Sequence, residues 1–230
     1  MKGFIYLLLS GMCLGTIGIF VKLIGPNISP YLLATIRIIS AAILIFVFLA
    51  SDRRTSLLRL RRGDLRIFLV SGFFGVVFGF GFFVKSLTLI PVANAVLLMY
   101  IYPVSTAILA AIFLNERFGK YTLIALLMTL AGIYFIYGHG ANHIVGAEGS
   151  LYALIAGIGY SVFIVSMRYM EKSGHSFWDV VFWPLLLGGL MLVPFNLTER
   201  VVFIPFENIV MLVFGMIFIS TLLGYLFLSL

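Results

Sequence analysis

The sequence is poor in charge, in acidic residues, in histidine and in cysteine. Only 10% of its 230 residues are charged, whereas an ordinary soluble domain has about 25%. This deficit excludes a soluble globular domain. The single cysteine, Cys13, excludes an internal disulfide framework and a cysteine-based metal cluster. His139 and His143 are four apart in a predicted outer loop with Glu148, but a metal site needs more ligands and an ordered scaffold; we expect no metal site and no cofactor.

Long runs of apolar residues make up most of the sequence. Hydrophobic residues make up 63% of the chain, and the mean hydropathy is +1.19. A helix needs about 20 apolar residues to cross a bilayer, and turn or charge signals divide the chain into eight such runs, at about 4–24, 30–50, 67–87, 92–114, 121–138, 149–170, 177–195 and 209–230. These runs lack the alternation of barrel strands, so the sequence predicts an all-α membrane protein built as a multi-span helix bundle.

The basic residues are distributed unevenly between the two predicted sides of the membrane. Arginines crowd the loop at 53–66, and further Lys or Arg residues flank every second loop, whereas the alternate loops hold only Arg200. Because Lys and Arg are retained in cytoplasmic loops, we expect a cytoplasmic N-terminus in a cell membrane, in a prokaryote the inner membrane. This topology, with the lipid bilayer as partner, accounts for the net charge of +7 without nucleic acid. The arginine loop would also suit an amphipathic helix on anionic headgroups.

The sequence carries an internal repeat. Displacing it so that Gly3 falls on Gly149 also places Lys22 on Arg168, and a nearly equal displacement places Gly72 on Gly215. We therefore predict a first unit of five helices over 1–140 and a second unit over 147–230 that is truncated after three. Because five is odd, the second unit is expected to be inverted in the membrane. The repeat symmetry predicts roughly two further spans in the native gene product.

At this point the residues resemble a known family. The run Leu33-Ala34-Thr35-Ile36-Arg37 in the second span, and the fourth span with Pro103 that ends in Asn115-Glu116-Arg117, are similar to the EamA domain of the drug/metabolite transporter superfamily. The resemblance implies ten helices in two inverted repeats, cytoplasmic termini, and transport of amino acids, drugs or other small metabolites. This chain departs from that pattern by having about eight spans.

Three cations within the predicted spans are candidates for a substrate cavity: Lys22, Arg37 and Lys85. Intramembrane charges are costly and usually face the bundle interior or water. Lys22 and Lys85 are close enough to span ends to extend to the interface instead. Arg37 is deeper, roughly 10 Å in at about 1.5 Å per residue. It would either be satisfied by carbonyls at a neighbouring helix end or supply positive potential to a solute cavity.

The fourth span supplies the remaining candidates. Pro103 should kink its helix, which is either a static bend or a way to expose neighbouring side chains to a central cavity. The residues that would then face the cavity are Tyr100, Tyr102 and Ser105, with Asn94 serving either packing or substrate. Glu116, beside Arg117, is interpreted as a structural residue in a loop ion pair or helix-end contact. Gly11 and Gly15, like Gly75 and Gly79, have GxxxG spacing, which favours close helix packing or a pore lining.

These patterns favour a secondary transporter, an exporter or exchanger, that moves a small organic metabolite by alternating access. Cations without an acidic partner favour a substrate that bears a carboxylate, with an amino acid as first choice. An intramembrane enzyme and a non-transporting membrane fragment are the alternatives, although the sequence has no HExxH motif and no phosphate-binding glycine loop. The sequence leaves the oligomeric state, the solute and the coupling ion open.

Overall fold

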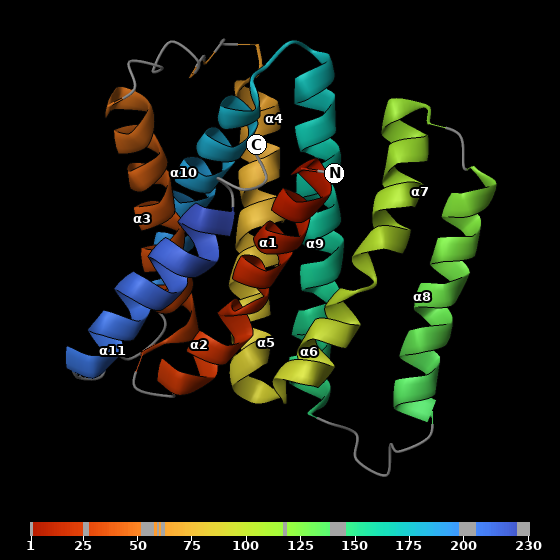
Figure 1. Cartoon of the computed structure of the whole chain (residues 1–230), viewed down its shortest axis with the longest axis horizontal. Coiled ribbons are helices and arrows are strands. Elements are labelled where there is room, and N and C mark those ends of the chain that lie inside the picture. Colours follow the sequence, from red (N-terminus) through yellow and green to blue (C-terminus); the bar gives the residue numbers. More distant parts are fainter. Residues whose placement is uncertain are drawn as a thin grey trace.

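The computed structural model describes residues 2–24, 28–51, 58, 60, 63–116, 119–138, 146–197 and 206–224. Every regular element within those ranges is a helix, and they contain no strand. The helices lie side by side as a bundle (Figure 1). The prediction of an all-α membrane helix bundle is therefore confirmed.

The helices follow the predicted apolar runs, several of them as broken segments. The first four runs contain α1 (Lys2–Gly15) and α2 (Ile17–Ile24); α3 (Pro30–Ser51); α4 (Leu65–Val70), the π-helix η3 (Ser71–Gly81) and α5 (Phe82–Leu89); and α6 (Val92–Met99) and α7 (Tyr102–Leu114). The later runs contain α8 (Lys120–Gly138), α9 (Ala147–Lys172), α10 (Phe177–Asn196), and α11 (Phe206–Val210) followed by the π-helix η4 (Met211–Leu223).

Five stretches of the described residues are long and apolar enough to cross a membrane. They are 30–51, 65–89, 92–114, 147–172 and 177–196, and a shorter apolar helix covers 8–24. The chain is thus a multi-pass membrane protein. Crossings by 8–24, by α8, and by α11 with η4, which the eight-span prediction also requires, stay predictions.

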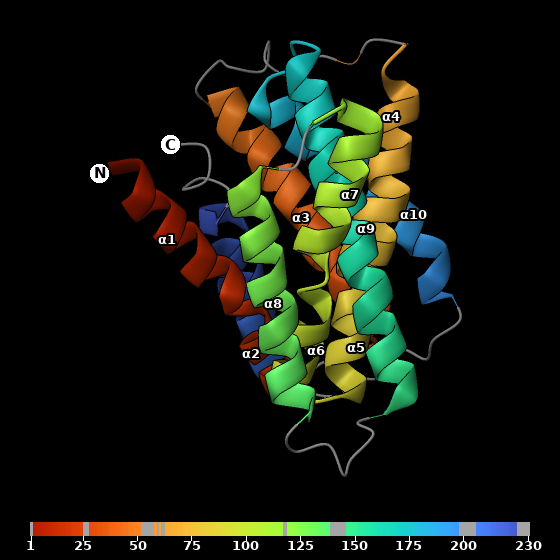
Figure 2. The same cartoon turned by 90° about the vertical axis from the view of Figure 1, so that its right-hand side faces the viewer.

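Helix α9 lies at the centre of the contacts. It packs against η3, α5, α6 and α7, while α10 packs against α3 and η3, and η4 packs against α1, α2 and α3. Helices α1 and α2 run down the bundle in the view of Figure 1, whereas α9 runs up it. Helix α8 stands at the edge of the bundle in that view, beside α7, and the turned view shows how steeply α1 is inclined (Figure 2).

Glycine lets η3 approach its two neighbours almost backbone to backbone. A Cβ on Gly159 of α9 would lie 2.5 Å from the Phe74 carbonyl oxygen and 2.7 Å from the Gly79 nitrogen, and a Cβ on Gly188 of α10 would lie 2.6 Å from the Gly72 carbonyl oxygen. Lipid provides no hydrophobic drive between helices, so close van der Waals contact holds such a bundle together. The GxxxG pair in η3 is therefore a packing surface.

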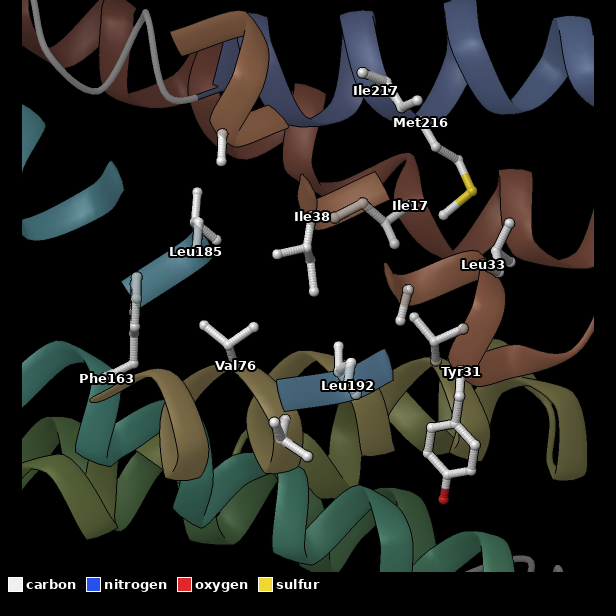
Figure 3. Packing of buried hydrophobic residues seen from close by; sticks show 14 of the residues in the cluster. Ile17, Tyr31, Leu33, Ile38, Val76, Phe163, Leu185, Leu192, Met216 and Ile217 are labelled. Carbon is white, nitrogen blue, oxygen red and sulfur yellow. The ribbon is translucent and has the colours of Figure 1, made fainter. Parts of the chain in front are cut away.

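The buried apolar side chains join both ends of the sequence. Ile38 of α3, Val76 of η3 and Leu185 of α10 lie within one cluster that continues to Ile17 and Met216, which Figure 3 shows on the facing sides of their helices. This packing fixes α2, α3, η3, α10 and η4 relative to one another. It positions the walls of the cavity described next.

Candidate functional site

A cavity of about 280 Å³ lies among the helices that the core holds in place. Its walls come from α1 and α2, α3, η3 and α5, α6 and α7, and α9, and they carry Gly11, Gly15, Gly18, Arg37, Phe80, Phe83, Met99, Tyr100, Tyr102 and Tyr160 among others. A Cβ on Gly11 or Gly15 would meet no atom within 4 Å. The GxxxG pair of the first span therefore borders open space, whereas the pair in the third span is packed.

Arg37 supplies the formal positive charge of the cavity wall. Arg37 comes from the first half of α3 and is 3% exposed. The guanidinium carbon lies 5.5 Å from the centre of the Phe80 ring, a distance typical of a cation–π contact. Arg37 thus combines burial, charge and access to the cavity.

The fourth span is interrupted beside the cavity, midway along its length (Figure 1). Helix α6 ends at Met99 and α7 begins at Tyr102. Pro103 explains the position of the break, because it has no N–H to donate and its ring crowds the carbonyl of residue 99, four positions earlier. Ser161 of α9 donates to the Tyr102 carbonyl oxygen at 2.9 Å, which holds the start of α7 against α9. The positive end of the α7 dipole consequently lies at the cavity.

Aromatic rings connect the interrupted helix with the arginine. The Tyr102 and Tyr160 rings are 5.1 Å apart, and the Tyr160 and Phe80 rings are 5.6 Å apart. Tyr100 stacks on Tyr102 with centroids 5.9 Å apart. The site therefore pairs a buried cation with a wall of aromatic faces and tyrosine hydroxyls.

Five other candidates lie elsewhere. Lys22 is exposed at the end of α2, and the Lys85 ammonium lies 5.5 Å from the centre of the Tyr31 ring. Neither lines the cavity, and the same holds for Asn94, Pro103 and Ser105. The Ser105 hydroxyl donates to the Ile101 carbonyl oxygen at 3.3 Å. Within the described residues, the structure thus gathers Arg37, Tyr100 and Tyr102 and adds Tyr160, which the sequence did not single out.

Two further cavities adjoin the same helices. One of about 260 Å³ shares Leu14 and Tyr160 with the first and extends to Arg168 and Glu171 at the end of α9. The other, of about 550 Å³, opens between α4, α7 and α9 beside exposed Phe74 and Phe113. Its lining surface is mostly apolar, and it lacks the combination of buried cation and interrupted helix that the first cavity has.

Glu116 joins the end of α7 to the end of α9. Its two carboxylate oxygens accept from Arg168 Nη1 and Lys172 Nζ, each at 2.9 Å. Asn115 ends α7 with φ of 53°, a left-handed conformation that asparagine tolerates. The hydrogen bond from Lys172, assisted by the charges of Arg168 and Lys172, lowers the pKa of Glu116 below its ordinary value. Glu116 therefore forms its ion pairs across the bundle with residues of α9; Arg117, its neighbour in sequence, is outside the described residues.

Replacing Glu116 with Gln is expected to lower the thermal midpoint slightly at neutral pH, since exposed ion pairs contribute little. Because the pKa of Glu116 is lower in the folded state than in the unfolded state, the ionised carboxylate stabilises the fold at pH values above the unfolded-state pKa. This stabilisation is lost as the pH falls through the folded-state pKa. The difference in thermal midpoint between the parent and E116Q should therefore disappear at acidic pH. Thermal unfolding in detergent measures it. Glu171→Gln, the same change at an exposed neighbouring carboxylate, is the control, and equal midpoints for the two variants at neutral pH would contradict the assignment.

A second polar cluster, which sequence reasoning missed, lies at the same end of α9. His175 Nε2 is 2.9 Å from an Asp64 carboxylate oxygen, and His175 Nδ1 is 3.3 Å from an Asp179 carboxylate oxygen. The helix-capping pattern from Ser176 to Asp179 was the available signal. No group of His, Cys, Asp or Glu within the described part of the chain is arranged to hold a metal ion.

The described fold and cavity can now be compared with known proteins. The model of the EamA-like transporter family matches residues 1–138. The chain belongs to this family. The matched region contains α1 to α8 and every cavity residue singled out from the sequence, whereas Tyr160 follows it.

Two relatives of this EamA protein are transporters by name. It is 32% identical to an uncharacterised transporter of Archaeoglobus fulgidus over 46% of this chain and 37% of the relative. It is 25% identical to an uncharacterised inner membrane transporter of Salmonella typhimurium over 97% of this chain and 76% of the relative. The chain thus spans well under half of the archaeal protein.

A solved crystal structure has a similar fold, with a TM-score of 0.68. It is 22% identical in sequence and is matched over 99% of this chain and 77% of its own. At that identity the similarity concerns the fold alone.

Proposed function

We propose that this protein is a secondary carrier, an exporter or exchanger, that moves a small organic metabolite through the cavity around Arg37. The observation that carries the proposal is the joint placement of a buried guanidinium and an interrupted helix at one cavity. Interrupted helices in transporters commonly direct their N-terminal ends at anionic substrate groups. A carboxylate-bearing substrate follows, with an amino acid as first choice.

Alternating access is proposed to arise from two inverted units, 1–140 and 147–230. Several features support this division. The third helix of each unit is π-helical, as η3 and as η4. The contact of α9 and α10 with η3 has a counterpart in the contact of α1, α2 and α3 with η4. The first helices of the two units run in opposite directions (Figure 1). Rocking of one unit against the other would then expose the cavity to each side in turn.

Flux into proteoliposomes tests the carrier directly. We expect uptake of anionic or zwitterionic metabolites that bear a carboxylate, and no uptake of purely cationic ones. Turnover of a substrate without flux would indicate an intramembrane enzyme. Absence of both activities would indicate a non-transporting fragment. Transport of cations alone would contradict the role assigned to Arg37.

The proposed orientation places the N-terminus and the arginine loop in the cytoplasm. A cysteine introduced at Ser56, in a Cys13→Ser background, should react with a membrane-impermeant thiol reagent only after the cells are opened. The uneven distribution of loop arginines and lysines is the reason. A cysteine at Ala147, the first residue of α9 at the other end of the bundle, is the control expected to react in intact cells. Reversal of the two results would overturn the orientation.

A further inference from the structure

The cavity of about 550 Å³ between α4, α7 and α9 is a groove on the surface of the bundle. Helix α9 packs against both η3 and α7, and side chains on the two opposite walls are exposed, Phe74 of η3 to 41% and Phe113 of α7 to 66%. We call this cavity the surface groove. It is separate from the cavity around Arg37, with which it shares no lining residue.

The surface groove has a polar end and an apolar body. Arg66 lies in the first turn of α4 and Tyr169 in the last turn of α9, and these two turns are at the same end of the bundle, the upper end in Figure 1. Ser166 lies one turn further along α9 and is 7% exposed. Deeper in the span the lining is apolar, with Val70, Phe74, Leu109 and Val162. The groove thus has the polarity of a lipid molecule, with a headgroup end and a chain end.

Arg66 provides the positive charge of the polar end. It is exposed, and within the described ranges no hydrogen bond or ion pair joins it to another residue. Glu116 engages the basic side chains at the end of α9 instead. The carboxylate of Asp64, two residues before Arg66, is 2.9 Å from the His175 ring. The guanidinium is therefore available to an anionic ligand.

We propose that the surface groove binds an anionic phospholipid, with its phosphate at Arg66 and an acyl chain along the apolar body. Guanidinium and phosphate form paired, charge-assisted hydrogen bonds, and basic pockets between membrane helices bind anionic headgroups. The hydroxyls of Ser166 and Tyr169 supply further donors. Five more arginines in the sequence at 53–62 attract anionic lipid to this end of the bundle. The site does not depend on the transported solute.

Quenching of a single tryptophan by brominated lipids tests the site in a bilayer. Trp178→Phe and Trp183→Phe remove both native tryptophans, and Phe113→Trp places a reporter on the groove wall. Vesicles contain phosphatidylglycerol and phosphatidylcholine with the same acyl chains, and one of the two lipids is brominated. We expect phosphatidylglycerol to bind beside the reporter about fivefold more tightly than phosphatidylcholine, since one arginine near an anionic lipid contributes roughly that factor.

Two charge-removing variants of this reporter protein separate the site from general surface charge. Arg66→Gln should bring the two lipids to about equal affinity. Lys120→Gln removes a positive charge from the exposed start of α8, outside the groove, and should keep the preference. Equal affinities in the parent, survival of the preference in R66Q, or the same loss in both variants would overturn the site. Absence of quenching by either lipid would show that protein, such as a second copy of the chain, covers the groove, and would overturn it equally.

Filling the groove tests the position of the acyl chain. Val70 on the groove wall is 45% exposed and Val47 of α3, outside the groove, is 52% exposed, so Val70→Trp and Val47→Trp are matched substitutions. In native mass spectrometry, we expect the parent and V47W to retain a phosphatidylglycerol molecule through a detergent wash that removes phosphatidylcholine. V70W should lose it. Equal retention by V70W and V47W would contradict the proposed position.

Discussion

Arg37→Gln is expected to weaken transport of a carboxylate-bearing substrate by about ten- to hundredfold, seen chiefly as a raised KM. A hydrogen bond to a charged group contributes about 1.5–3 kcal/mol, and about 1.4 kcal/mol corresponds to a factor of ten in affinity. Arg37 is the arginine that the cavity wall provides for such a contact. Initial rates in proteoliposomes over a range of substrate concentrations measure the effect.

Lys85→Gln is the matched control, because it removes the same charge from a span without touching the cavity. A substrate analogue that carries an amide in place of the carboxylate should be transported equally by the parent and by R37Q. Size-exclusion profiles and thermal midpoints establish that the variants are folded. If K85Q raises KM as much as R37Q does, or if R37Q leaves KM unchanged, the cavity assignment is wrong.

Gly159→Val is expected to prevent stable assembly of the bundle. The first carbon of the new side chain would collide with backbone atoms of η3, 2.5 Å from the Phe74 oxygen and 2.7 Å from the Gly79 nitrogen. Backbone in a packed helix pair cannot rotate away as a side chain can, so α9 and η3 must separate. Overpacking of this kind costs about 1–3 kcal/mol and occasionally more. We expect a lowered thermal midpoint and a large loss of monodisperse protein on size-exclusion chromatography.

Two other glycines provide controls for this substitution. Gly132→Val in α8 adds the same side chain where no atom lies within 4 Å of the added Cβ, so the folded yield should stay close to that of the parent. Gly15→Val borders the cavity, again with no atom within 4 Å, and should fold while reducing flux. Loss of folded protein in all three variants would show that glycine acts here through helix geometry rather than through contact.

The membrane architecture follows from the sequence because it depends on local composition. Long apolar runs and the arginine loop are visible in any short window, and the lipid solvent leaves helices as the structure that satisfies their backbones. The break in the fourth span is equally local, because Pro103 removes a hydrogen bond within its own helix. The depth of Arg37 along α3 also follows from counting residues.

Only the tertiary structure separated residues that look alike in sequence. The glycine pairs 11/15 and 75/79 have the same spacing. The 11/15 pair borders a cavity, whereas the 75/79 pair packs against α9, because the helix that lies next to each pair decides whether it packs or lines a space. The partners of Glu116 are likewise remote in sequence, and so is one partner of His175, Asp64, which lies 111 residues away. The local hydrophobic pattern of the sequence determines which segments enter the membrane. The contacts between segments depend on packing across the whole bundle, so they cannot be inferred from short stretches of sequence.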